Sequence, residues 1–233
     1  FLYFIGRNKG SVQTMGILQD KRLWGAVVGT VALFAAYRVW KSGKKGKKSH
    51  NTAKQGLDCV VISGPAGVGK GTIIDMLQKE TPGKYAFSVS HATRQPREGE
   101  VDGVHYNFVS VEEFERMIAA DEFVEYAKVH ANYYGTSKAA LKKVSAAGKI
   151  AIVEIDVKGA KIFKDRVLGQ LKCCFFFFTA PSLEELHNRM RKRGKDSEES
   201  MTKRLETAKT ELDFIKENPS VYDRVLTNDN LDA

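Results

Sequence analysis

The chain of 233 residues has few of the residues that cross-link or stiffen small secreted proteins: three cysteines, five prolines and two tryptophans. Cys173 and Cys174 are adjacent in an apolar run, Cys59 is far from both, and no zinc-ligand spacing is present. Adjacent cysteines rarely bridge one another. We therefore interpret all three as reduced, buried thiols of a reducing compartment, and exclude a disulfide-scaffolded domain.

Acidic residues are nearly absent from the first 56 residues, which hold 11 Lys/Arg and the single acid Asp20. The rest of the chain has 26 Lys/Arg and 27 Asp/Glu, so the net charge of +9 comes from this first segment. The globular part is close to neutral and lacks the excess of basic residues that nucleic-acid binding requires. We predict no nucleic-acid partner.

The first segment contains an uncharged run, LWGAVVGTVALFAAY, at residues 23–37. With the next three residues it approaches the roughly 20 residues that span a bilayer. Six lysines and no acids follow in residues 41–54, so the positive-inside rule predicts that the C-terminal side faces the cytosol. We expect a leader at 1–22, a transmembrane or targeting segment at 23–40 and a basic linker at 41–56.

These features predict that residues 23–40 anchor the protein in a membrane and that its globular part faces the cytosol. The membrane would belong to an organelle; the mitochondrial outer membrane is an example. A mitochondrial presequence, which would direct the protein to the matrix, is an alternative because acids are scarce, although lysine dominates over arginine. A soluble cytoplasmic protein is another alternative. A cleaved secretory signal lacks a suitable cleavage site.

A glycine-rich stretch, GPAGVGKGT, occupies residues 64–72. The β-branched apolar run at 57–63 precedes it, and residues 72–80 follow with the apolar spacing of a helix face. Strand, loop and helix in this order form the context of a phosphate-binding loop, in which Lys70 supplies a positive charge. Gly71 stands where Ser or Thr usually ligates Mg²⁺, so we expect Thr72 to hold the metal through water.

The next segment favours recognition of a second phosphate and of a base. Arg94 and Arg97 lie three apart in an extended, proline-containing stretch, a pair suited to bidentate phosphate binding. Tyr106 and Tyr134 add hydroxyl donors. Glu125 offers two adjacent acceptors, which suit the neighbouring N–H donors on the Watson–Crick edge of guanine.

Seven blocks, in order, resemble guanylate kinase, which transfers the γ-phosphoryl group of ATP to GMP. They are SGPAGVGKGT, FSVSHATRQPREGE, DGVHYNFVS, FVEYAKVHANYYGTS, VEIDVKGA, RMRKRGKDSEESMTKRL and TNDNLD. The resemblance covers residues 57–233. It implies a P-loop α/β fold of three layers (α/β/α) with a parallel sheet, a GMP-binding insertion at about 91–139 and a helical lid at about 187–200.

The resemblance also implies the residues of each site and their substrates, ATP and GMP or dGMP. The ATP-binding residues would be Gly64, Pro65, Ala66, Gly67, Val68, Gly69, Lys70, Gly71, Thr72 and Asn228. The GMP-binding residues would be Ser90, Arg94, Arg97, Tyr106, Glu125, Tyr134, Thr136 and Glu154. The catalytic groups would be Lys70, Arg94, Arg193, Arg204 and Asp156, with Mg²⁺ as cofactor and Asp156 orienting its water shell or nearby arginines.

Local patterns support this expected fold. Apolar runs at 58–63, 149–155 and 171–179 predict buried parallel strands, and Ser110, Ser182 and Asp196 each precede a Glu by three residues, which predicts helix starts. The family continues past NDNLD into a closing helix, without which an apolar patch would be exposed. The oligomeric state is left open.

Two rival functions stay open. A non-catalytic guanylate-kinase-like module would bind a phosphorylated peptide in the GMP site, but such modules typically lose the loop lysine and the lid arginines. An adenylate-type kinase shares the GKGT ending of the loop, but Glu125 and the Arg94–Arg97 segment argue against it.

Overall fold

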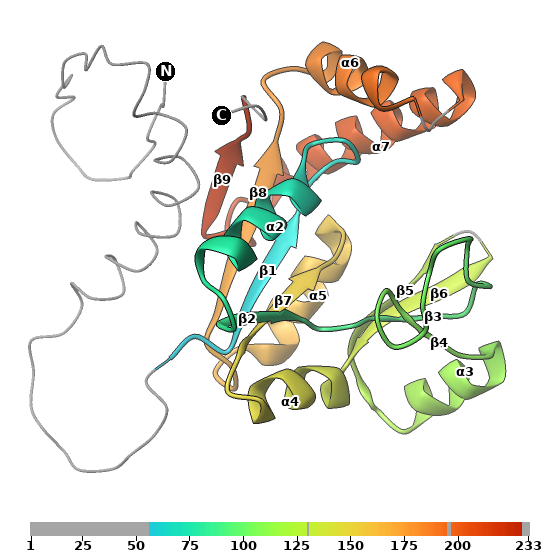
Figure 1. Ribbon diagram of the computed structural model, residues 1–233, viewed down its shortest axis with the longest axis vertical. Helices are drawn as coiled ribbons and strands as arrows, with labels where there is room; N and C mark the ends of the chain where they lie inside the picture. Colours follow the sequence, from blue (N-terminus) through green and yellow to red (C-terminus); the bar gives the residue numbers. More distant parts are fainter. Residues whose placement is uncertain (1–55, 130, 195–196, 230–233) are drawn as a thin grey trace, which may run out of the picture. The chain divides into compact units, whose positions relative to one another are not determined.

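The computed structural model describes residues 56–129, 131–194 and 197–229, and Figure 1 shows their arrangement. The predicted leader, membrane segment and most of the basic linker, up to residue 55, lie outside the described residues. Within the described ranges, no helix combines the length and apolarity needed to cross a bilayer.

The larger of two sheets has five strands, β2, β7, β1, β8 and β9 in spatial order, and every neighbouring pair is parallel. Their bounds are β1 Cys59–Ser63, β2 Tyr85–Phe87, β7 Ile150–Glu154, β8 Cys173–Thr179 and β9 Arg224–Thr227. The three predicted apolar runs correspond to β1, β7 and β8, so the predicted parallel sheet is confirmed. Because its strands are parallel, their carboxyl ends meet at one edge.

Helices cover both faces of this sheet (Figure 1): α2 Lys70–Glu80 lies on one face, and α4 Lys138–Ala146, α5 Val157–Val167 and part of α7 Glu198–Glu217 lie on the other. The helix α6 Leu183–Arg193 packs with α7 beyond the strand ends. Val61 of β1, Val153 of β7 and Phe177 of β8 are buried together with residues of α4 and α5, with part of α7 packed against them. Val60 and Ile62 alternate with these along β1, and α2 lies over that face.

Serine side chains cap the helices as short polar residues do elsewhere. The hydroxyls of Ser110 and Ser182 accept the N–H of Glu113 and Glu185 at 3.1 and 3.0 Å, which confirms those two predicted starts. The third expectation is wrong by one residue. Ser197 caps α7 by accepting the N–H of Ser200, because either of two neighbouring short polar residues can take this position and the sequence does not choose between them.

The second sheet has four strands in the order β4, β3, β6, β5 and carries one helix. The elements are β3 His91–Ala92, β4 Asn107–Phe108, α3 Val111–Ala119, β5 Phe123–Val129 and β6 Asn132–Ser137. Phe114 of α3 stacks on Phe123 at 4.3 Å between ring centroids, which gives this part its own core. These elements fall in the segment predicted as an insertion.

An ionic contact joins the two parts at Asp121. Its carboxylate accepts hydrogen bonds from Lys138 at 2.6 Å and from Arg166, at the end of α5, at 3.0 Å. Arg166 also donates to the carbonyl oxygen of Phe123 at 3.2 Å. Together with packing between α5 and β5, these bonds set where β5 lies relative to the parallel sheet.

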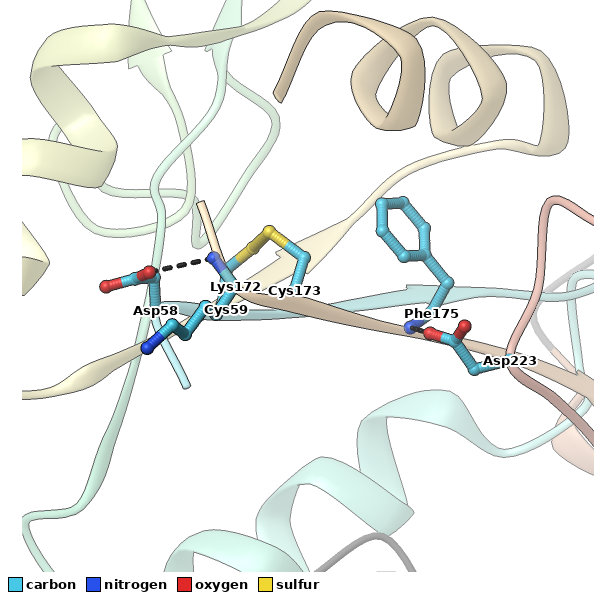
Figure 2. Close-up of a disulfide and its surroundings, with 6 residues drawn as sticks. All are labelled: Asp58, Cys59, Lys172, Cys173, Phe175 and Asp223. Carbon is cyan, nitrogen blue, oxygen red and sulfur yellow. Dashed lines mark hydrogen bonds between the residues drawn. A yellow bond between two sulfur atoms is a disulfide. The ribbon is translucent and has the colours of Figure 1, made fainter. Parts of the chain in front are cut away.

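A disulfide joins Cys59 of β1 to Cys173 of β8 (Figure 2). The two residues are register partners with Cα atoms 4.8 Å apart, so their side chains meet on one face of the sheet. The interpretation of all three cysteines as reduced thiols is therefore wrong for this pair, because sequence spacing does not reveal strand register. Cys174 is a free thiol, and burial raises its pKa.

We expect alkylation of the denatured, unreduced protein to label only Cys174, and alkylation after reduction to label all three cysteines, as counted by mass spectrometry. Reduction should also lower the free energy of unfolding, because the bridge spans 114 residues, for which chain entropy gives about 4–5 kcal/mol. The Cys174→Ser variant is the control and should take no label before reduction. Three labels without reductant would contradict the bridge.

Candidate active site

Three glycines of the loop between β1 and α2, Gly64, Gly67 and Gly69, have a positive φ. Gly64 has φ +149°, and a Cβ there would collide with the carbonyl oxygen of Phe178 on the neighbouring strand. Gly69 has φ +95° and takes the N-cap position of α2 without a side-chain cap. The positive end of the helix dipole and its first N–H groups therefore face the loop, as in sites that bind phosphate.

Lys70 begins α2 and turns its ammonium back over the loop. Nζ donates to the carbonyl oxygens of Gly64 at 2.6 Å and Pro65 at 3.3 Å. It also lies 3.6 Å from Oε1 of Glu154, the last residue of β7. The lysine side chain is only 15% exposed, so its charge is held by the loop carbonyls and by this carboxylate.

Asn228, directly after β9, connects the loop to the far side of the sheet. Its side-chain amide donates to the carbonyl oxygen of Val68 at 2.8 Å, and its backbone N–H donates to Thr179 at 2.7 Å. Val68 is itself fully buried against Leu186 and Met190 of α6. The loop is thus packed between the strand ends and α6, whose C-terminal part is the start of the predicted lid segment.

Glu125 on β5 is a buried acid with 5% exposure. Its Oε1 accepts a hydrogen bond of 2.6 Å from the hydroxyl of Thr136, its register partner on β6. The pKa of Glu125 is raised from its ordinary value near 4.5 to about 7, mainly because the carboxyl is buried; the hydrogen bond from Thr136 opposes the shift and the negative charge of Asp156 adds to it.

Asp156 lies beside Glu125 at the start of α5. It caps that helix by accepting the N–H of Gly159 at 2.7 Å. A Cβ at Gly159 would lie 3.1 Å from Oε2 of Glu125 and 3.2 Å from Oδ1 of Asp156. The two carboxylates therefore flank one point that glycine leaves open. Glu154, at the end of β7, thus contacts the loop lysine, whereas Asp156, two residues later, is near the buried Glu125.

Arg94 forms a bidentate pair with Glu100, at 2.6 and 2.7 Å. This pairing with Arg94 holds the pKa of Glu100 at about 2 and raises the pKa of Arg94 above its ordinary value. The guanidinium carbon also lies 5.0 Å from the ring centroid of Tyr106 and 5.5 Å from that of Phe108. Arg94 is thereby fixed in direction and stays charged.

The two predicted tyrosines meet next to this arginine. The rings of Tyr106 and Tyr134 contact edge to face, with centroids 6.0 Å apart. Burial raises the pKa of Tyr106, Arg94 opposes the shift, and the charges of Tyr134 and Glu154 add to it. Glu154, which contacts Lys70, is thus one of the charges that raise the pKa of Tyr106.

Four other residues predicted for the two sites are Ser90, Arg97, Gly71 and Thr72. The carbonyl oxygen of Ser90 accepts the N–H of Asn107 at 2.8 Å, and the backbone N–H of Arg97 donates to Glu100 at 2.8 Å, with the Arg97 side chain exposed. Gly71 and Thr72 are exposed on the first turn of α2, and nothing lies within 4 Å of a Cβ placed on Gly71.

The predicted lid arginines lie on the two packed helices α6 and α7. Arg193 is the last residue of α6 and is exposed. Nε of Arg204, on α7, lies 3.4 Å from the hydroxyl of Ser200 one turn earlier. Residues 195–196, in the predicted lid, lie outside the described ranges.

A sequence model of the family described as guanylate kinase matches residues 57–233. This chain belongs to the guanylate kinase family. It is 43% identical over 222 residues to guanylate kinase 1 of Oryza sativa subsp. japonica, a match that covers 95% of this chain and 53% of that protein. It is 42% identical over 173 residues to guanylate kinase of Sus scrofa, covering 74% of this chain and 85% of the relative.

The chain spans about half the length of the two plant relatives, from Oryza sativa and Arabidopsis thaliana. Among solved structures, guanylate kinase from Anaplasma phagocytophilum is similar, with a TM-score of 0.54 and 28% identity. That match covers 76% of this chain and 78% of the other. The P-loop α/β fold of the guanylate kinase family is thus confirmed.

Three residues of this guanylate kinase family site escaped the sequence prediction. Glu100 stands six residues after Arg94 in an exposed loop, and only the folded loop brings the two together. Gly159 sits inside a helix, where glycine is unfavourable, and this was a usable signal. Glu211 of α7 is half-buried, with one carboxylate oxygen fully buried and without a hydrogen-bond partner among the described residues, and nothing in the adjacent sequence indicates this.

We expect the Glu125→Gln variant to be more stable than the wild type at pH 8 and similar at pH 4. Because the folded pKa is raised, Glu125 favours the folded state while protonated, and this contribution is lost as pH rises from about 4.5 to 7. The shift corresponds to about 3 kcal/mol at most. Urea unfolding at both pH values measures it, with Glu98→Gln on the surface as control. Equal loss of stability at both pH values would contradict this account.

Proposed function

We propose that this protein is an ATP:GMP phosphotransferase, which moves the γ-phosphoryl group of ATP to GMP or dGMP and yields ADP and GDP. The observation that carries the proposal is the presence of two phosphate-binding groups in one chain: Lys70 lies over the loop and 3.6 Å from Glu154, and Arg94 is held by Glu100 beside the ring of Tyr106. Transfer between two phosphates requires a binding group for each of them.

On the donor side, the loop N–H groups and Lys70 receive the ATP phosphates. The ammonium has three donors and now uses two loop carbonyls as acceptors. Phosphate oxygens carry more charge than carbonyls, so the ammonium exchanges them for phosphate when ATP binds. The side-chain amide of Asn228 holds the carbonyl of Val68 in place. In the proposed complex, Asn228 borders the adenine ring of ATP.

On the acceptor side, Arg94, Tyr106 and Tyr134 hold the GMP phosphate, helped by Arg97 and Ser90. The pairing with Glu100 presets the direction of the Arg94 guanidinium before GMP arrives, which lowers the entropy lost on binding. The remaining donors of the guanidinium then bind phosphate oxygens.

Glu125 reads the base, with Thr136 fixing its carboxylate and Asp156 next to it. Guanine presents N1–H and an exocyclic amine to these acceptors, whereas adenine presents an acceptor at N1 that would face a carboxylate without a proton between them. Donors from guanine relieve the repulsion between the two acids. The same repulsion penalises any base that lacks these donors.

The reaction needs placement and charge neutralisation more than covalent chemistry. The attacking GMP oxygen is already anionic, so no general base is required. Lys70, the loop N–H groups and Arg94 neutralise the phosphates, and Arg193 and Arg204 approach them as the lid closes and excludes water.

Mg²⁺ fits the donor set that the site offers. The hydroxyl of Thr72 is exposed on the first turn of α2, and the carboxylate of Glu154 lies next to Lys70. These are a few hard oxygen donors, which suits an ion that keeps several waters and binds mainly to phosphates. Bound there, Mg²⁺ supplies charge neutralisation and orientation of the ATP phosphates.

The test is coupled ADP release by the full chain with ATP and Mg²⁺, comparing GMP, dGMP, AMP and UMP. We expect turnover with GMP and dGMP only. Lys70→Ala should lower kcat by about 100-fold or more, because it removes a charge that neutralises the transferred group. Glu125→Gln should lower kcat/KM for GMP by about 100-fold, because the amide donates where guanine also donates. Lys79→Ala, on the exposed end of α2, is the control.

Tight GMP binding by the folded wild type without any turnover would contradict the kinase and favour the rival phosphopeptide-binding module. Equal turnover of AMP and GMP would contradict the role of Glu125.

For localisation, we propose that residues 23–40 anchor the protein in a membrane with the kinase domain on the cytosolic side. The support is the 18-residue segment and the six lysines that follow it. We expect the protein to resist extraction by alkaline carbonate and to be digested by protease added to intact organelles, and a chain beginning at residue 57 to be soluble. Release of the full chain by carbonate would contradict the anchor, and protection from protease would indicate the matrix.

A further inference from the structure

The loop between β3 and β4 (Figure 1) carries two of the groups that hold Arg94 in place. Glu100 pairs with the guanidinium, and the ring of Tyr106 lies 5.0 Å from it. Little apolar packing supports the loop, because Val101 is 54% exposed and Val104 is 62% exposed. Its shape therefore depends mainly on hydrogen bonds within the loop and to β4.

His105 closes this loop with its side chain. The ring atom Nδ1 accepts the backbone N–H of Val101 at 2.9 Å, and the backbone N–H of His105 donates to the carbonyl oxygen of Val101 at 3.0 Å. Nearby, the carboxylate of Asp102 accepts the backbone N–H of Phe108 at 2.8 Å, which ties the loop to β4. The contact between His105 and Val101 is thus one of two side-chain bonds that hold this part of the loop.

The contact between His105 and Val101 joins the two ends of the segment that supports the arginine. Val101 directly follows Glu100, and His105 directly precedes Tyr106. The imidazole therefore keeps together the two residues that fix the direction of Arg94. Without this bond, Glu100 and Tyr106 are free to separate, and GMP has to order them again when it binds.

The bond to Val101 requires a neutral imidazole. A protonated histidine carries N–H groups on both ring nitrogens and cannot accept from a backbone N–H. Histidine is the side chain that ordinarily gains this proton between pH 8 and pH 5, and His105 is exposed to solvent. Mild acid therefore removes the acceptor on which this contact depends.

The other charged and titratable groups around this loop differ from His105. The ion pair with the arginine holds the pKa of Glu100 at about 2. Burial lowers the pKa of His91 on β3, although two carboxylates oppose the shift. The remaining groups are Arg94, Arg97, Glu98, Asp102, Glu122 and, on β6, Tyr134. Arginine, carboxylates and tyrosine ordinarily titrate outside pH 5–8. Among these groups, His105 is the one whose protonation opens the loop.

We propose that His105 is a positioning residue of the GMP site, whose neutral imidazole closes the segment from Glu100 to Tyr106 and whose protonation releases it. GMP binds the closed loop more tightly than the open one, so the affinity for GMP falls as the pH decreases. Charge alone predicts the opposite result, because an imidazolium near an incoming phosphate attracts it. The inference deepens the proposed function and rests on it for the identity of the ligand.

The His105→Asn variant separates the hydrogen bond from the proton. Oδ1 of asparagine is the same number of bonds from the backbone as Nδ1 of histidine, and it accepts a hydrogen bond at any pH. We expect the full-length wild type and this variant to bind GMP with similar Kd at pH 8 by titration calorimetry. At pH 5.5 the Kd of the wild type should exceed that of the variant by about three- to tenfold, the effect of one neutral hydrogen bond. The ratio between the two proteins cancels the titration of GMP itself and of Glu125.

Two further variants complete the comparison. His105→Ala lacks the acceptor at every pH, so its Kd for GMP should already be raised at pH 8 by about the same factor. His187→Asn on α6 is the matched control and should follow the wild type at both pH values. A constant ratio of Kd between the wild type and His105→Asn, or tighter binding by the wild type at pH 5.5, would overturn the proposal.

Nuclear magnetic resonance tests the loop without a ligand. Between pH 8 and pH 5.5 the amide proton shift of Val101 should move upfield in the wild type, as the loss of a hydrogen bond predicts, and stay constant in His105→Asn. A shift in the wild type that does not move upfield would overturn the inference. A wild type without affinity for GMP at either pH would overturn the proposed function alone, and the amide shifts would still decide the role of His105.

Discussion

The parallel pairing of β1 between β7 and β8 is the constraint on which the site depends. The register of β1 with its neighbours sets Ile62 opposite Glu154 and Ser63 opposite Phe177. The phosphate loop begins directly after Ser63. Strand pairing alone therefore places the carboxylate of Glu154, at the end of β7, near the loop lysine. The disulfide between β1 and β8 fixes the same register from the other end of the strands. A slip of one residue would move every one of these groups to the wrong face.

The candidate site contains acidic side chains in surroundings that disfavour their charged form. Glu125 is a buried acid and Glu211 a half-buried one; burial raises the pKa of each to about 7, and the negative charge of Asp156 adds to both shifts. Each destabilises the empty protein near neutral pH. In the proposed function, the donors of guanine compensate for this at Glu125. Arg94 differs from these acids because it already has a partner of opposite charge in the empty protein. The carboxylate of Glu100 pairs with its guanidinium and fixes its direction.

Much of this arrangement was predictable from the sequence because it is local. A β-branched run, a glycine-rich loop and a helix with periodic apolar residues specify the donor site within 25 residues, and Ser110 and Ser182 mark helix starts by their own chemistry. Contacts across strands were not predictable. The bridge between Cys59 and Cys173 depends on register, the positions of Glu154 and Asp156 depend on where α5 starts, and Arg94 meets Glu100 only in the folded loop. The start of α7 at Ser197 shows that even local caps are ambiguous by one residue.

The central claim is that an anionic Glu125 receives the guanine donors. In the empty protein at pH 7 this carboxyl is about half protonated, since its pKa is about 7. Binding of guanine favours the anion, so GMP binding should release roughly half a proton more from the wild type than from Glu125→Gln at pH 7, and this difference should vanish by pH 9. Calorimetry of GMP binding in buffers of different ionisation enthalpy measures it, and the variant cancels the ionisation of GMP itself. Equal proton release by the two proteins at pH 7 would contradict the account.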